Sequence, residues 1–183
     1  AMTKSSLSLI NFSNVFTKVY FPRIFIPLVP TIAGLIDFII ALCITIFLMI
    51  YYGIMPSLNL IIIPYLVVLM VLFSAGIGFF LSAIAIMYRD IRNAIQFLTQ
   101  LLMYATPVVW PVSLLSEKFG ESVMNIYCFY PMVGVVEGFR SALIGTTSLP
   151  WNLILPGTIS SITIFITGMI YYSRKEKTFA DVA

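Results

Sequence analysis

The sequence predicts an all-α integral membrane protein, and three observations lead to that fold class. Of the 183 residues, 61% are hydrophobic and only 9% are charged, whereas a soluble domain carries about 25% charged residues. The mean hydropathy is +1.06. Several apolar runs reach about 18 residues or more, the length at which a helix crosses a bilayer, and they lack the alternation of a membrane β-barrel.

Several classes of function have no support in the composition. The net charge of +3 is mild, so nucleic-acid binding is not indicated. There is no histidine, and the positions of Cys43 and Cys128 argue against a disulfide or a metal site. No phosphate-binding loop of the form G-x-x-x-x-G-K-[ST] is present. We therefore expect no catalytic residues, no metal and no cofactor bound by this chain.

Residues 11–20 have the pattern of an amphipathic helix lying along the membrane surface. The apolar side chains fall on one face and the polar ones on the other. The apolar face consists of Phe12, Val15, Phe16, Val19 and Tyr20. Pro22 is expected to end this helix, and Arg23 and Pro27 mark the turn into the bilayer.

We expect one membrane domain over residues 1–183, with four spans at about 28–52, 58–88, 94–112 and 151–172. Asp37 is the only charge within the first span, which makes it a functional candidate, although a packing residue paired with a neighbouring helix is the alternative. Small residues in the second span predict the close approach of another helix. They are Ser74, Gly76, Gly78, Ser82 and Ala83. At the fourth span, Trp151 and the pair Tyr171-Tyr172 suggest aromatic belts.

The third predicted span is the most polar of the four. Gln96, Thr99 and Gln100 share one helical face, and Tyr104 follows one turn later. Pro107 is expected to kink this helix. We favour a pathway lining for this polar face over a plain contact between helices.

The uncharged apolar run that opens the segment 123–145 is too short to span the membrane. Its 14 uncharged residues from 123 to 136 would form a helix of about 21 Å, against a hydrocarbon core of about 30 Å. Pro131, Gly134 and Gly138 are expected to interrupt it, and Glu137 and Arg140 follow at i,i+3 helical spacing. We expect either a re-entrant segment or a folded loop that caps the outer face.

The basic residues indicate the orientation of the chain. Four spans place both termini on one side, and eight of the ten basic residues then lie together on that side. They are Lys4, Lys18, Arg23, Arg89, Arg92, Arg174, Lys175 and Lys177. The positive-inside rule makes this side cytoplasmic, together with the tail 173–183, and places the segment 123–145 outside. The charged turn at residues 87–93 is either a solvated turn or a docking site for a cytoplasmic partner.

Five sequence blocks, in order along the chain, resemble the permease subunits of type 2 ABC exporters for polysaccharide, such as O-antigen of lipopolysaccharide, capsule and teichoic acid. The blocks are residues 18–27 (KVYFPRIFIP), 88–92 (YRDIR), 106–111 (TPVVWP), 130–140 (YPMVGVVEGFR) and 177–181 (KTFAD). Each block is weak alone, and the specificity of the resemblance comes from their shared order over nearly the whole chain.

The resemblance implies a six-span protein of the bacterial inner membrane that works as a homodimer. Each copy would bind a cytoplasmic ATPase subunit, which supplies ATP hydrolysis and holds ATP and magnesium. Residues 11–21 would be the coupling helix, with Phe16, Lys18 and Arg23 at the ATPase contact and Arg89 and Asp90 on the same side. Residues 123–145 would form external re-entrant helices that close the exit. Because only ten residues precede the coupling helix, we expect an N-terminally truncated chain with four of the six spans.

The cargo implied by the resemblance is a glycan on a polyprenyl-pyrophosphate lipid. Sugar rings stack on aromatic side chains while their hydroxyls need hydrogen-bond partners, so an aromatic and amide lining suits a glycan. The candidate path residues are Gln96, Gln100, Tyr104, Trp110, Tyr127 and Tyr130. For Trp110 and Tyr127, anchoring at the membrane interface is an equal alternative. Glu137 and Arg140 are expected to brace the external helices. A permease for a drug or small lipid, or a membrane scaffold without transport, are the alternative functions.

Overall fold

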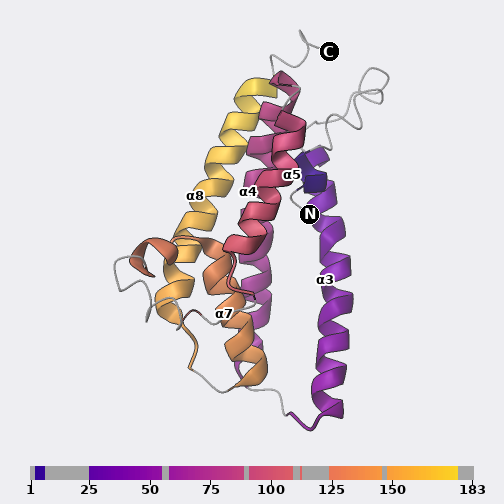
Figure 1. The fold of residues 1–183 in the computed structure, drawn as a ribbon, viewed down its shortest axis with the longest axis vertical. Helices are drawn as coiled ribbons and strands as arrows, with labels where there is room; N and C mark the ends of the chain where they lie inside the picture. The colour runs from indigo at the N-terminus through magenta and orange to yellow at the C-terminus, as the bar shows by residue number, and fades with distance from the viewer. Residues whose placement is uncertain are drawn as a thin grey trace. The chain divides into compact units, whose positions relative to one another are not determined.

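The computed structural model describes residues 3–6, 25–54, 58–88, 91–108, 112, 124–145 and 148–176. All regular elements in these ranges are helical: α3 (Phe25–Tyr51), the 3-10 helix η1 (Leu58–Ile62), α4 (Ile63–Met87), α5 (Ile91–Ala105), α7 (Pro131–Ile144) and α8 (Trp151–Glu176) (Figure 1). Two further helical turns cover residues 3–6 and 124–127.

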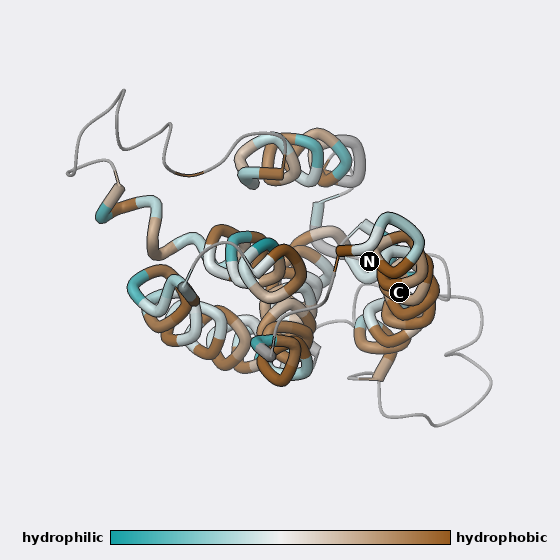
Figure 2. Tube along the Cα trace, turned by 90° about the horizontal axis from the view of Figure 1, so that it is seen from below, coloured by the Kyte–Doolittle hydropathy of each residue, from teal (hydrophilic) through white to brown (hydrophobic). Residues whose placement is uncertain are grey.

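Three helical segments are long and apolar enough to cross a membrane: Phe25–Tyr51, Asn59–Ala85 and Trp151–Lys175. Hydrophobic residues run along each of these helices in Figure 2. The predicted all-α membrane fold is therefore confirmed. The first, second and fourth predicted spans correspond to α3, to η1 with α4, and to α8, with boundaries that differ by a few residues.

The third predicted span differs from the structure at its end. A kinked helix was expected to continue through Pro107, but α5 ends at Ala105. The proline ring disfavours helical geometry in the residue before it and removes an N–H donor, so the helix stops instead of bending. With 15 residues, α5 is about 22 Å long. The four-span count and the orientation derived from it stay predictions.

The chain forms two compact units, each described separately below. Unit 1 comprises Ala1–Ile36, Val71–Met103 and Thr163–Ala183, and unit 2 comprises Asp37–Met70 and Tyr104–Ile162. In unit 1, Phe79 on α4 is the central side chain. Its ring lies 6.0 Å from that of Phe165 and 5.4 Å from that of Tyr172, both on α8. Tyr172 is fully buried, so it packs in the core instead of joining an interfacial belt as predicted.

Glycines allow α4 and α8 to approach backbone to backbone in unit 1. A Cβ on Gly76 would lie 2.8 Å from the Cα of Phe165, and a Cβ on Gly168 would overlap the carbonyl oxygen of Gly76. Ser74 and Ser82 are buried on α4, and their hydroxyls have no hydrogen-bond partner among the described residues. The small size of serine therefore explains why it occupies these two buried positions. The close approach of α4 and α8 confirms the predicted packing role of the small-residue patch.

Unit 2 places α7 beside η1 and the first turns of α8. Leu66, Val135 and Ile154 form the centre of its apolar core, and α7 contacts η1 directly. The prediction that Gly134 and Gly138 interrupt this segment is wrong, because both lie inside α7. A Cβ on Gly134 would lie 2.6 Å from the carbonyl oxygen of Leu153, so close packing outweighs the helix cost of glycine, about 1 kcal/mol.

We predict that Gly168→Leu destabilises the protein by about 1–3 kcal/mol, because a larger side chain must separate α8 from Gly76. Thermal unfolding of the detergent-purified protein provides the measurement. Ala41→Leu is the matched control, since Ala41 is exposed on α3 and leucine has room there. Equal melting temperatures for the two variants would contradict the packing described here.

Candidate functional site

Helix α7 has defined ends that fix the positions of its charged residues. Tyr130 precedes it with extended backbone angles, and Pro131 occupies the first turn, where a missing N–H costs nothing. Gly145 ends the helix with φ of 69°, a left-handed conformation that glycine adopts without strain. The uninterrupted helix between them puts Glu137 and Arg140 on one face, one turn apart.

Glu137 and Arg140 form an ion pair that also binds the main chain after α5. An Nη of Arg140 donates to Oε1 of Glu137 at 2.6 Å, and the same oxygen accepts the backbone N–H of Val112 at 2.9 Å. The other Nη of Arg140 faces the carbonyl oxygens of Pro107 and Val108 at 3.3 and 3.4 Å. We call these two side chains and their three main-chain partners the clamp. It ties the segment 107–112 to α7.

Partial burial strengthens the clamp relative to a solvated surface pair. The side chains of Arg140 and Glu137 are 29% and 16% exposed. A hydrogen bond to a charged group contributes about 1.5–3 kcal/mol, and the planar guanidinium reaches a carboxylate and a carbonyl at once. The clamp therefore fixes the chain that leaves α5 more firmly than an exposed ion pair, worth about 0–1 kcal/mol, would fix it.

Two tyrosines bind the end of α5 next to the clamp. Tyr127 donates its hydroxyl hydrogen to the carbonyl oxygen of Ala105, and the hydroxyls of Tyr130 and Thr106 are hydrogen-bonded at 3.1 Å. Burial raises the pKa of Tyr130, and burial with the nearby Tyr130 and Glu137 raises the pKa of Tyr127. Both hydroxyls therefore stay protonated at neutral pH, as Tyr127 must be to donate to the Ala105 carbonyl.

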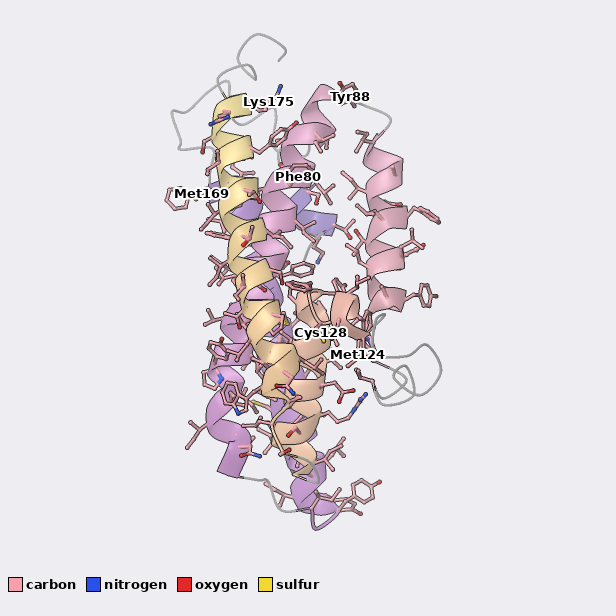
Figure 3. All side chains as sticks on the ribbon, turned by 90° about the vertical axis from the view of Figure 1, so that its left-hand side faces the viewer. Phe80, Tyr88, Met124, Cys128, Met169 and Lys175 are labelled. Carbon is pink, nitrogen blue, oxygen red and sulfur yellow. The ribbon has the colours of Figure 1, made fainter. Side chains whose placement is uncertain are left out.

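The structure brings four predicted site residues together in unit 2: Tyr127, Tyr130, Glu137 and Arg140. Tyr127 and Tyr130 have ring centres 6.5 Å apart. Both pack against the buried cluster of Val112, Val133 and Leu153, as do Met124 and Cys128, which Figure 3 labels. Cys128 and Cys43 are both free thiols.

Three other predicted path residues lie on α5. The side chains of Gln96 and Gln100 are exposed, and that of Tyr104 is 68% exposed. Asp37 is exposed on α3, and the ion pair found in the described part of the chain, Glu137 with Arg140, does not include it. The remaining predicted site residues lie outside the described residues: Phe16, Lys18, Arg23, Arg89, Asp90 and Trp110.

Sequence reasoning identified the charged pair but missed what it binds. The partners are main-chain atoms of Pro107, Val108 and Val112, which no side-chain motif reveals. One signal was available. A helix that stops before a proline leaves its last carbonyls without donors, and the Ala105 carbonyl finds one in the Tyr127 hydroxyl. In the described ranges no three acidic, histidine or cysteine side chains gather as metal ligands would.

We predict that Arg140→Lys destabilises the protein by about 1–2 kcal/mol, because an ammonium cannot bind the Glu137 carboxylate and the Pro107 carbonyl in one planar arrangement. Equilibrium unfolding in mixed micelles measures the loss. The change should be smaller when Glu137→Gln is already present, since the two residues share one network. Lys175→Arg serves as a control, with an expected change within about 0.5 kcal/mol. Fully additive effects of the two clamp changes would argue against the pair.

Comparison with known proteins found relatives that match nearly the whole chain. No family model matches the chain. It is 26% identical over 170 residues to the O-antigen export system permease protein RfbA of Myxococcus xanthus, covering 92% of this chain and 64% of that protein. Two proteins of the same name from Klebsiella pneumoniae are 24% and 25% identical over 182 residues, covering 98% of this chain and 68% of each. The chain thus spans about two thirds of the length of these relatives.

The long apolar helices and these relatives together indicate a multi-pass protein of the bacterial inner membrane. The resemblance carried by the five sequence blocks is confirmed by an independent comparison over nearly the whole chain. By sequence, this protein is similar to the permease proteins of O-antigen export systems.

Proposed function

We propose that this chain is a membrane-spanning subunit of an ATP-driven ABC exporter that moves a lipid-linked, O-antigen-like polysaccharide out across the inner membrane. The observation that carries the proposal is the similarity to O-antigen export permeases over 92–98% of the chain. The relatives bear the name of a transport component, in keeping with a sequence that offers no nucleotide-binding loop or histidine-based catalytic group.

The polar face of α5 is the proposed lining of the path. Gln96, Gln100 and Tyr104 recur at four-residue intervals, which places them along one face of the helix, and all three side chains are exposed. Amide groups offer donors and acceptors for sugar hydroxyls, and an aromatic ring offers a surface on which a sugar ring can stack. Many weak contacts of this kind suit a polymer that must keep moving.

The clamp provides a connection between this lining and the external segment. Pro107 and Val108 follow α5 directly, and Arg140 binds their carbonyl oxygens. A displacement of the end of α5 would therefore act on α7 through main-chain contacts. In the proposed exporter, residues 123–145 close the exit, and Trp110, Tyr127 and Tyr130 line the path beside them.

Energy would come from a separate cytoplasmic ATPase subunit that binds ATP and magnesium. The proposed contact is the amphipathic helix at residues 11–21, with Phe16, Lys18 and Arg23, helped by Arg89 and Asp90. A second copy of the permease would complete the path. ATP-driven movement of this contact would change the populations of closed and open arrangements.

Reconstitution of the full-length permease with its ATPase tests the proposal against its two alternatives. We expect a glycan carried on polyprenyl pyrophosphate to raise the rate of ATP hydrolysis, because cargo that binds one conformation preferentially shifts the transport cycle. Stimulation by hydrophobic drugs or small lipids, with no response to glycan-lipid, would assign the chain to the other kind of permease. Failure to co-purify with any ATPase would favour a scaffold.

We further predict that Tyr104→Ala lowers glycan-stimulated ATP hydrolysis about two- to tenfold, the value of one aromatic contact of about 0.5–1.5 kcal/mol. Phe47→Ala on α3 is the matched control, since Phe47 and Tyr104 are both 68% exposed aromatic residues. Basal hydrolysis should stay unchanged in both variants. An equal loss of stimulation in the two would remove Tyr104 from the path.

A further inference from the structure

The C-terminal turns of α8 carry a groove that the proposed transport path does not use. It has a volume of about 510 Å³, within the range of about 300–1,000 Å³ for ligand pockets. In the described part of the chain its lining residues all belong to α8: Ile166, Met169, Ile170, Ser173 and Arg174. Their spacing of three, four, seven and eight residues places them on one face of the helix, where Figure 3 labels Met169.

The lining changes from apolar to polar along the helix axis. Ile166, Met169 and Ile170 are 49%, 39% and 47% exposed, so they present apolar surface to whatever lies beside α8. Ser173 and Arg174 follow one turn later and are also exposed. From Ile166 to Arg174 the rise is about 12 Å. A ligand that follows this stripe needs a hydrocarbon part and a polar, anionic end.

The change from apolar to polar lining fits the position that the groove would have in a bilayer. Helix α8 has 26 residues, or about 39 Å, and so exceeds a hydrocarbon core of about 30 Å. Its last turn carries Arg174 and Lys175, of which Figure 3 labels Lys175. The cations at the end of α8 are therefore placed at headgroup depth, where a basic residue attracts an anionic lipid.

We propose that this groove binds an anionic phospholipid of the membrane leaflet that surrounds the C-terminal end of α8. An acyl chain lies along Ile166, Met169 and Ile170, and the phosphate accepts hydrogen bonds from Arg174 and Ser173. The site requires only that α8 spans the membrane, so it stands or falls separately from the nature of the cargo. It distinguishes phospholipids by headgroup charge and requires an attached chain.

Native mass spectrometry of the detergent-purified full chain tests the site. Titration with phosphatidylglycerol and with phosphatidylcholine of the same acyl chains should show tighter binding of the anionic lipid. Arg174→Gln should weaken phosphatidylglycerol binding about fivefold, the equivalent of about 1 kcal/mol for one cation near anionic lipid. Lys4→Gln is the matched control, because Lys4 is an exposed cation of unit 1 that does not line the groove. It should leave the affinity unchanged.

A second variant tests the apolar part of the groove. Met169→Trp should fill it and lower the affinity for phosphatidylglycerol while all charges stay in place. Should that variant fail to elute as a folded species, Arg174→Gln still decides the matter. Equal binding of the two phospholipids, or an equal loss in Lys4→Gln and Arg174→Gln, would overturn the proposal. So would full competition by glycerol phosphate, which has no acyl chain, or displacement by one equivalent of a polyprenyl diphosphate.

Discussion

The main-chain carbonyl groups at and just after the end of α5, those of Ala105, Pro107 and Val108, are the constraint on which the arrangement of unit 2 depends. Main-chain carbonyls that have no partner within a helix need donors from elsewhere. Tyr127 reaches Ala105, and Arg140 reaches Pro107 and Val108. Both donors come from the segment 124–145, which must therefore lie against the end of α5. The glycine contacts of α7 with α8 hold that segment in place from its other side.

Much of this fold could be predicted because its main features follow from the composition and spacing of residues that are close in sequence. The long apolar runs of α3, α4 and α8 exceed a bilayer crossing, and their composition is enough to identify them. The pairing of Glu137 with Arg140 followed from i,i+3 spacing, since two opposite charges one turn apart meet whenever the helix forms. The small-residue patch on α4 predicted a close helix contact, and Gly76 makes it.

The misses share one physical cause, because each depended on a partner distant in sequence. Gly134 was interpreted as an interruption of the segment. In the structure it is there because a Cβ at this position would collide with the carbonyl oxygen of Leu153. Tyr172 suggested an interfacial anchor, but the ring of Phe79 covers it. Pro107 suggested a kink, yet α5 ends at Ala105, about two turns before the predicted end at residue 112, and the Tyr127 hydroxyl donates to the Ala105 carbonyl there. The local sequence pattern suggests a role for a residue, but contacts with residues distant in sequence decide which role it has.

The clamp recognises main-chain atoms in the segment 107–112, not side chains. The exposed side chain of Val108 can therefore change while its main-chain hydrogen bond persists, whereas the side chain of Val112 is held in the core beside Val133 and Leu153. The surface at Val108 is thus free to vary in chemistry, while the hydrogen bonds that hold this part of the chain to α7 keep one geometry.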